Sequence, residues 1–261
     1  MPGKEQEPQT RNPYIGVVGA VGVGKTEITD LLVGNLGMHC FREQYPANKN
    51  LPLFYTCKKG DEKYYAFKSQ IFFITVKAEQ MAQIPKLLPA NAVAHDPADP
   101  VDEIIEEVQW RMGFISDDEH RTYLTAKKVL IDEALLPKPD IFYAVTASEE
   151  VVMQRIETRG REMELIFMKK YPDYFPNIVR AFNEWRLRQT APVVEIPTDG
   201  LNFIDDFKAR AQIIKHIQTW THYYLVSPNQ LNSTGRDGTA LVWPDSLRPS
   251  TAPNIKEQFL P

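Results

Sequence analysis

The sequence predicts an α/β fold, a three-layer domain with a parallel sheet flanked by helices. Two observations carry this prediction. Short β-branched runs alternate along the chain with longer helical segments, and parallel strands require such crossover helices. The first run, Tyr14–Val18, also leads through a glycine-rich turn directly into a helix. A chain of 261 residues fits one large α/β domain or two small ones.

The predicted elements follow this alternation from end to end. Each strand is a short apolar run, and we expect strands at Tyr14–Val18, 38–42, 91–95, 141–145 and 193–196. We expect helices at Lys25–Leu36, 64–85, 100–112, 117–135, 148–159, 163–188 and 203–222, several of them bounded by a glycine, a proline or a capping residue. Residues 44–63 are polar and rich in turn formers.

Three segments make up the predicted organisation. Residues 1–13 are polar and read as a flexible leader, not as a signal peptide. Residues 14–224 form the domain. Residues 225–261 contain several prolines and little periodicity, which predicts an irregular C-terminal tail.

Composition excludes several classes of protein. With 43% hydrophobic residues, 25% charged residues and a net charge of −4, the chain is neither collagen-like, disordered nor disulfide-stapled. It lacks the basic footprint of a general nucleic-acid binder and an apolar run of ~18 to 20 residues that would span a membrane. Cys40 and Cys57 show no metal-site spacing, so we expect reduced thiols and a cytoplasmic protein.

One motif indicates function directly. Eight consecutive residues match the phosphate-binding loop G-x-x-x-x-G-K-[ST]: Gly19, Ala20, Val21, Gly22, Val23, Gly24, Lys25 and Thr26. Glycines let successive N–H groups surround phosphate oxygens, and the next helix adds its positive end. Lys25 would reach the β- and γ-phosphates and Thr26 would ligate Mg²⁺. A ligand-free turn or a loop that has lost binding are the alternatives.

The rest of the sequence narrows the class of nucleotide-binding protein. It contains neither the N-K-x-D motif of GTPases nor a hydrophobic run ending in Asp-Glu, as in ATPases. Of the classes of protein that carry this loop, a small-molecule kinase is therefore the one we expect.

Four further segments, in this order, resemble the deoxynucleoside kinase family. They are FREQYPANKNLPLFY at 41–55, YAFKSQIFFITVKAEQ at 65–80, RIETRGREME at 155–164 and PTDGLNF at 197–203. The resemblance runs from about Ile15 to Phe203. It implies a P-loop nucleoside-kinase-like fold, ATP and Mg²⁺ as cofactors, a nucleoside or nucleotide substrate and a homodimer.

Glu43 is the candidate catalytic base. It follows a predicted strand, so it should lie at the carboxyl edge of the sheet, where ligands bind. There it can accept the proton of an attacking 5′-hydroxyl. The alternative is an ordinary surface charge at a strand end.

A base pocket is predicted on the helix at 64–85. Phe67, Gln70 and Lys77 share one face, on which Phe67 can pack on a base and Gln70 can donate to and accept from its edge. An amphipathic helix with solvated polar residues is the alternative. The resemblance places Tyr55 at the sugar hydroxyl, and it implies an Arg where this chain has Lys77.

A lid is predicted at about 155–170. Arg155, Arg159 and Arg161 cluster there and can close over ATP, with Arg159 and Arg161 stabilising the transferring phosphoryl group. We expect Arg155 to bind the cofactor and Glu164 to bind the substrate. The alternative is a solvated basic helix end.

The family pattern breaks after the third predicted strand. Asp96 is retained and would help to hold Mg²⁺, and Asp102 stands where the family reads the base, but Pro97 replaces the family's Arg. The chain is then either an active kinase in which Arg111, Arg121 or a lid arginine compensates, or a nucleotide-binding subunit. A nucleoside monophosphate kinase is a further alternative. We expect ATP-dependent phosphorylation of the 5′-hydroxyl of a deoxynucleoside.

Overall fold

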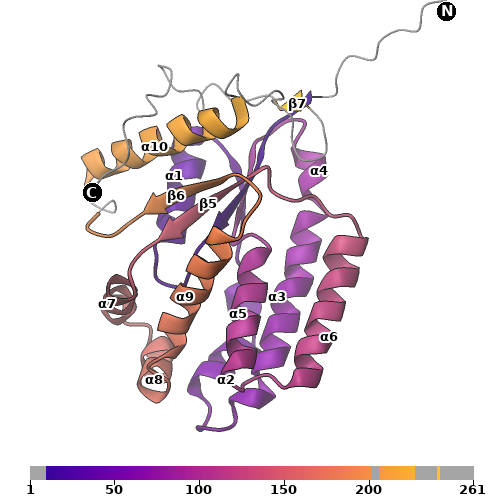
Figure 1. The fold of residues 1–261 in the computed structure, drawn as a ribbon, viewed down its shortest axis with the longest axis vertical. Helices are drawn as coiled ribbons and strands as arrows, with labels where there is room; N and C mark the ends of the chain where they lie inside the picture. Colours follow the sequence, from indigo (N-terminus) through magenta and orange to yellow (C-terminus); the bar gives the residue numbers. More distant parts are fainter. Residues whose placement is uncertain (1–9, 202–205, 227–239, 242–261) are drawn as a thin grey trace, which may run out of the picture.

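Five parallel strands form the central sheet, in the spatial order β3-β4-β2-β5-β6 (Figure 1). The structure is a computed structural model that describes residues 10–201, 206–226 and 240–241. The strands are β2 (Tyr14–Val18), β3 (His39–Arg42), β4 (Val93–Asp96), β5 (Ile141–Thr146) and β6 (Val193–Pro197). The register sets Arg42 opposite Asp96 at the carboxyl edge. The predicted parallel sheet is confirmed.

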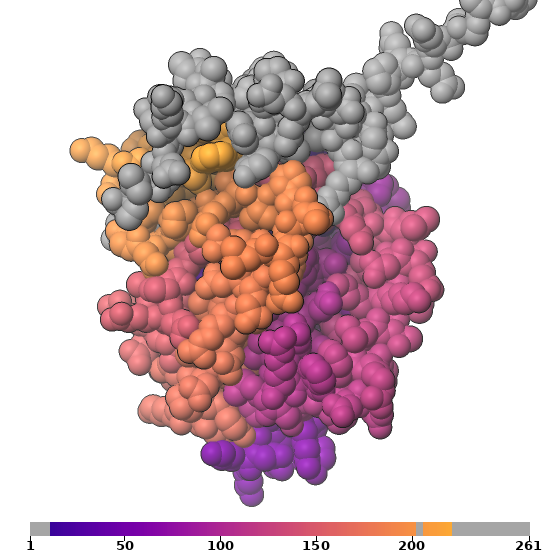
Figure 2. Space-filling view, viewed as in Figure 1, coloured from indigo at the N-terminus to yellow at the C-terminus, as the bar shows by residue number. Residues whose placement is uncertain are grey.

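Helices cover both faces of this sheet. They are α1 (Lys25–Leu36), α2 (Asn50–Thr56), α3 (Ala66–Met81), α4 (Ile84–Leu87), α5 (Pro100–Arg111), α6 (Asp117–Lys127), α7 (Glu149–Arg159), α8 (Glu162–Lys170), α9 (Tyr174–Leu187) and α10 (Phe207–Val226). Helix α1 packs on β2, β3 and β4, and α10 packs on β6. Helix α3 contacts α5 and α6, and α5 contacts α9. The side chains of α9, α5 and α6 cover one face in the space-filling view (Figure 2).

Several helices differ from their predicted bounds. The turn-rich segment 44–63 contains α2 and the 3₁₀ turns Tyr45–Ala47 and Glu62–Tyr64. Asn48 starts α2, because its Oδ1 accepts from the backbone N–H groups of Asn50 and Leu51. Pro85 does not end the long helix: α3 stops at Met81, and Pro85 lies in the first turn of α4, where a missing N–H is tolerated.

Two other predicted helices are also divided. The segment 117–135 is α6 followed by a π-helical turn at Lys128–Glu133. Its start follows from a capping box, in which Ser116 and Glu119 bond to each other's backbone N–H. The segment 163–188 is split between α8 and α9, and Ser148 caps α7 as predicted.

The ends of the chain differ from the predicted leader and tail. Thr10–Arg11 forms β1, which pairs in parallel with β7 at Ala240–Leu241. Helix α10 continues to Val226, and most of the predicted tail lies outside the described residues, as does Phe203. Both terminal guanidinium nitrogens of Arg11 donate to Asp140 at 2.8 Å, and Asp140 also accepts from the N–H of Tyr14. The last residues of the predicted leader therefore belong to the fold.

We expect Arg11→Met to destabilise the protein by about 3 kcal/mol, because it removes the two charge-assisted hydrogen bonds that Arg11 donates to the buried Asp140 carboxylate. Urea denaturation would measure the loss. The control is Arg121→Met, which removes an exposed pair with Asp118 and should leave the midpoint unchanged. Equal midpoints for all three proteins would contradict the role of Arg11.

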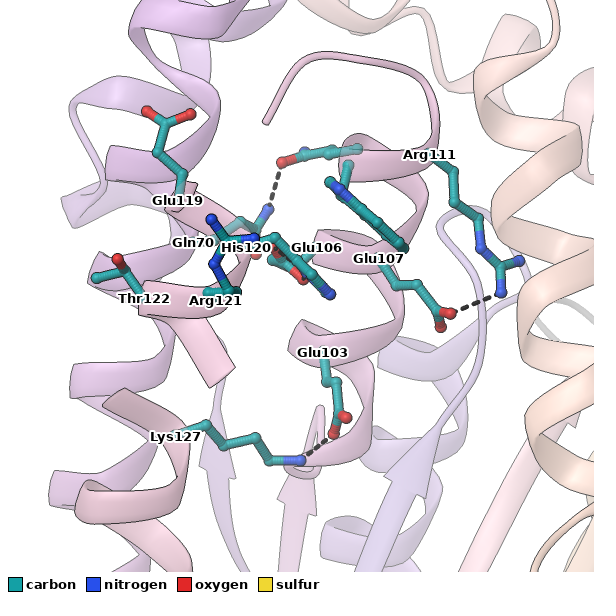
Figure 3. A network of polar contacts seen from close by, with 12 residues as sticks. Gln70, Glu103, Glu106, Glu107, Arg111, Glu119, His120, Arg121, Thr122 and Lys127 are labelled. Atoms are coloured by element: carbon teal, nitrogen blue, oxygen red, sulfur yellow. Dashed lines mark hydrogen bonds and ion pairs between the residues drawn. The ribbon is translucent and has the colours of Figure 1, made fainter. Parts of the chain in front are cut away.

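A buried acid fastens α5 to α6. Glu106 is completely buried, and His120 Nδ1 lies 2.9 Å from its carboxylate, between the two helices in Figure 3. The His120 ring stacks on Trp110 with centroids 4.1 Å apart. Burial raises the pKa of Glu106 to about 7, although the hydrogen bond with His120 opposes that shift. This packing holds α5, which carries Asp102.

Because the pKa of Glu106 is higher in the folded protein than in the unfolded chain, the folded state binds more protons from about pH 4.5 to 7. The free energy of unfolding should therefore fall as pH rises through this range. Glutamine cannot ionise at this position. We therefore expect the free energy of unfolding of Glu106→Gln to rise by about 1 to 2 kcal/mol relative to that of wild type as the pH increases from 5 to 8.

Denaturation curves at several pH values would measure this gain. The control is Glu107→Gln, because Glu107 pairs with Arg111 at the surface and should leave the slope unaltered. Parallel curves for wild type and Glu106→Gln would refute the assignment.

Candidate active site

The glycine-rich loop leaves β2 through a turn that tolerates no side chain at Gly19. A Cβ on Gly19 would lie 2.5 Å from the carbonyl oxygen of Val145 in β5. At the other end of the loop, Gly24 caps α1 with φ of 99°, a conformation that favours glycine. The two positions bend the loop into a cradle at the N-terminus of α1, as the motif predicts.

This loop forms one wall of a cleft of about 890 Å³, within the size range of small-molecule sites. The cleft lies at the carboxyl edge of the sheet. Ten of the predicted site residues line it: Val21, Gly22, Gly24, Lys25, Thr26, Glu43, Asp96, Arg155, Arg159 and Arg161. Predicted loop residues Gly19, Ala20 and Val23 instead line a small void beneath the loop.

The Lys25 ammonium is held by its own loop. Its Nζ donates to the carbonyl oxygens of Gly19 at 2.9 Å and Ala20 at 2.8 Å. Crowding by protein lowers the pKa of Lys25, and the negative charges of Asp96 and Glu43 oppose that shift. The ammonium is thus half-buried beside two carboxylates, at the position where the motif binds phosphate.

Glu43 follows β3 and opens onto the cleft. Although its side chain keeps contact with solvent, the surrounding protein raises the pKa of Glu43 above the ordinary value, while the charge of Lys25 lowers it. The strand end is fixed from α3, because Gln80 Nε2 donates to the Arg42 carbonyl at 2.9 Å. A carboxylate with a raised pKa is a better proton acceptor than a free glutamate.

Two oxygen ligands suited to a hard cation line the same cleft. Thr26 is exposed there in the first turn of α1, and Asp96 ends β4 with its Oδ2 accepting from Thr29 Oγ1 at 2.8 Å. Within the described part of the chain, no group of three or more His, Cys, Asp or Glu residues could hold a metal by itself. A cation here would need further oxygens from a ligand.

The lid arginines differ in their partners. Arg155 is fixed on the loop and β6 edge, since it donates to Val23 O at 3.0 Å and to Thr198 O at 2.7 Å. Arg159 donates to the buried Glu164 at 2.6 Å, and Arg161 lies 3.5 Å from the same carboxylate. Glu164 therefore holds both arginines, and it does not itself line the cleft.

The other predicted substrate residues lie behind the cleft and do not line it. Gln70 and Asp102 are buried between α3 and α5, and Tyr55 and Phe67 pack nearby in the core. Lys77 Nζ lies 3.4 Å from Asp102 and donates to the Pro97 carbonyl. This buried group adjoins the cleft at Pro97, which lines the cleft and whose carbonyl oxygen accepts from Lys77.

The arginines expected to compensate for Pro97 are not all in place. Arg111 pairs with Glu107 at 2.6 Å and Arg121 pairs with Asp118, both at the surface, and neither lines the cleft. Both predicted helices carry an acid three or four residues before the arginine, and such neighbours pair on an exposed face. The lid arginines do line the cleft.

Sequence reasoning missed several residues of the site. Tyr45 lines the cleft, and the Arg161 guanidinium lies over its ring at 5.2 Å. Tyr45 follows the predicted catalytic Glu43 by two residues, and this closeness in sequence could have indicated that it belongs to the site. Thr198 is buried and accepts from Arg155, and it lies in the segment 197–203 that resembles the family. Gln109, which binds Gln70 in the buried group, belongs to no motif.

Over residues 10–201, 206–226 and 240–241, no helix combines the length and apolarity needed to cross a bilayer.

Comparison with known proteins identifies the family of this chain. The deoxynucleoside kinase family profile matches residues 15–222. The chain is 25% identical to a Bacillus subtilis deoxyadenosine/deoxycytidine kinase over 81% of its length and 94% of the relative's. It is 26% identical to a Lactobacillus johnsonii deoxyguanosine kinase over 76% of its length and 88% of the relative's.

A solved structure shares the fold. Deoxyadenosine kinase from M. mycoides with bound dATP superposes with a TM-score of 0.65 at 23% identity, over 78% of this chain and 97% of that one. The P-loop kinase fold predicted from the sequence is confirmed. With its cleft, its phosphate-binding loop and the match over residues 15–222, the chain belongs to the deoxynucleoside kinase family and is a phosphotransferase.

Proposed function

We propose that this enzyme transfers the γ-phosphoryl group of ATP to the 5′-hydroxyl of a deoxynucleoside. The observation that carries the proposal is that one cleft combines the phosphate-binding loop, Glu43 and two lid arginines. Phosphoryl transfer needs little covalent help from a protein, so positioning and charge neutralisation do most of the work. These groups supply both.

The donor phosphates would lie on the loop of residues 19–26. Its N–H groups and the N-terminus of α1 attract anions, and Lys25 would exchange its two carbonyl partners for phosphate oxygens. Arg159 and Arg161, which Glu164 already orients, would offset negative charge on the transferring phosphoryl group. Arg155 would support the donor side by holding the loop against Thr198.

Thr26 and Asp96 would hold Mg²⁺ together with phosphate oxygens of the donor. Both line the cleft beside the loop, and both offer the oxygen atoms that this ion prefers. When bound, the ion supplies positive charge that stabilises the phosphate oxygens.

Glu43 would act on the acceptor. The 5′-oxygen forms a bond to the γ-phosphorus, the bond from that phosphorus to the β–γ bridging oxygen breaks, and ADP leaves. The hydroxyl proton passes to the Glu43 carboxylate.

None of the predicted substrate residues lines the cleft in this structure. The acceptor would therefore have to extend beyond Glu43 to bring its sugar to Tyr55 and its base to Phe67, Gln70, Lys77 and Asp102. Glu164 would act on the substrate through Arg159 and Arg161.

The charges on the acceptor side favour a nucleoside over a nucleoside monophosphate. A phosphate on the acceptor needs cations that face it. Near Glu43, Lys77 pairs with Asp102, and Arg42, which lines the cleft, pairs with Asp30. Lys77 also supplies a positive charge at Pro97, where the family resemblance implies an arginine.

A panel of acceptors with γ-labelled ATP would test the proposed function. We expect label to appear on deoxynucleosides, with little on ribonucleosides or nucleoside monophosphates. Tight ATP binding without transfer to any acceptor would instead favour a nucleotide-binding subunit.

Glu43→Gln should lower kcat by about 10²- to 10⁴-fold and leave the KM for ATP nearly unchanged, because the base is lost while the loop remains. Wild-type activity should fall as the pH drops through the pKa of Glu43, which the surrounding protein places above that of a free glutamate. The variant should lose this acid limb.

The matched control is Glu149→Gln, which removes an exposed carboxylate paired with Arg180. It should keep both the rate and the acid limb of wild type. A loss of less than about tenfold in Glu43→Gln, with the acid limb retained, would exclude Glu43 as the base.

A further inference from the structure

A chain of buried hydrogen bonds runs behind the cleft, from β2 to the strand end that leads to Glu43. The Tyr14 hydroxyl of β2 lies 3.0 Å from His95 Nδ1 of β4, and His95 Nε2 lies 3.0 Å from Gln80 Oε1 of α3. Gln80 Nε2 then donates to the carbonyl oxygen of Arg42 at 2.9 Å. Tyr14 and His95 are completely buried, and Gln80 is 9% exposed.

The carbonyl at the end of this chain fixes the direction of every bond in it. A backbone carbonyl only accepts, so the amide nitrogen of Gln80 must face Arg42 and its amide oxygen must face His95. That oxygen needs a donor, which places the proton of a neutral imidazole on Nε2 and leaves Nδ1 to accept from the Tyr14 hydroxyl. Burial and the charge of Lys77 hold the pKa of His95 well below its usual value, which favours this neutral form.

The same carbonyl belongs to the peptide bond that joins Arg42 to Glu43. Because a peptide unit is planar, a hydrogen bond to its oxygen also orients the nitrogen and Cα of Glu43. Strand β3 ends at Arg42, opposite Asp96, so the ladder itself does not extend to Glu43. Exposed Gln44 donates to this oxygen as well, in a longer bond of 3.3 Å. The bond from Gln80 is thus the shorter of the two side-chain bonds to this peptide unit.

His95 ties this peptide unit to the strand of the proposed metal ligand. Successive side chains of a strand point to opposite faces, so His95 faces α3, whereas Asp96 accepts from Thr29 of α1 on the other face. Through Gln80, the end of β3 is therefore connected to β4 one residue before Asp96. The two carboxylates of the cleft, Glu43 and Asp96, are held in one frame.

We propose that Gln80 is a positioning residue for Glu43, and that His95 and Tyr14 hold the Gln80 amide in the orientation this requires. The proposal rests on the proposed function, in which Glu43 accepts the proton of the 5′-hydroxyl. Neither Gln80 nor His95 lines the cleft, so both act from behind it. Without the bond from Gln80, the Arg42–Glu43 peptide can turn and the carboxylate loses its aim. A small misplacement of a reacting group is enough to slow a reaction.

The first test is Gln80→Met, which keeps the length of the side chain and removes its hydrogen bonds. We expect kcat for deoxynucleoside phosphorylation to fall about tenfold, as expected for one hydrogen bond. The KM for ATP should stay close to that of wild type, because the phosphate-binding loop is unchanged. The control is Gln83→Met, at an exposed glutamine that donates to Glu79 O and should alter neither constant.

A double-mutant cycle separates positioning from a general loss of packing. In the Glu43→Gln background there is no carboxylate to aim, so adding Gln80→Met should change the residual rate by less than about twofold. A general disturbance of the cleft would instead lower the rate by the same factor in both backgrounds.

A second pair of variants serves if Gln80→Met does not fold. His95→Met removes the donor that orients the Gln80 amide, so kcat should fall in the same direction. His95→Gln offers an amide donor in its place and should retain more of the wild-type kcat than His95→Met does.

Equal losses from Gln80→Met in both backgrounds, no loss in the wild-type background, or equal kcat values for the two His95 variants would overturn the proposal. Phosphorylation of deoxynucleosides by wild type would still support the proposed function in each of these cases. If wild type phosphorylates no deoxynucleoside, the proposed function fails and this inference fails with it.

Discussion

The close approach of two backbones, at the end of β2 and in β5, is the constraint on which the cleft depends. Only glycine fits at position 19, where a Cβ would meet the Val145 carbonyl at 2.5 Å. The turn that follows brings the loop back to the start of α1, and Val23 O then receives hydrogen bonds from Arg155 and Thr198. The phosphate-binding backbone is thus held by β5, α7 and β6 before any ligand arrives.

Charge is balanced within the cleft by groups that a ligand would compete for. Lys25 rests on two loop carbonyls, and Arg159 and Arg161 share Glu164. A triphosphate would replace the two carbonyl partners of Lys25 with charged phosphate oxygens. Arg159 and Arg161 would already be held in place by Glu164. Preorganised cations of this kind lower the cost of rearrangement during the reaction.

Local signals explain what could be predicted from the sequence. The loop, α1 and the residues at strand ends depend on a few neighbouring positions, so Lys25, Glu43 and Asp96 could be assigned to one edge of the sheet before the structure. Helix α2 could not, because its start depends on Asn48, whose amide is held by Ser69 from α3.

Contacts between distant segments set the other limit on prediction. Residues 10–13 are held in the fold by the ion pair of Arg11 with Asp140, which lies 129 positions along the chain. The buried hydrogen bonds of Gln109 with Gln70 and Tyr174 likewise need the packing of α5 on α3 and α9. No motif marks such pairs, since nothing in their local sequence distinguishes them from ordinary amphipathic helix positions.

Two polar contacts join α3 to α5, one between Gln70 and Gln109 and one between Lys77 and Asp102. They make the spacing of residues along these helices as restrictive as their composition. Inserting or deleting one residue between Asp102 and Gln109 would turn one of these two side chains by about 100° around α5 relative to the other. Only one of the two pairings could then survive, so drift in this family member should proceed there by substitution and not by insertion or deletion.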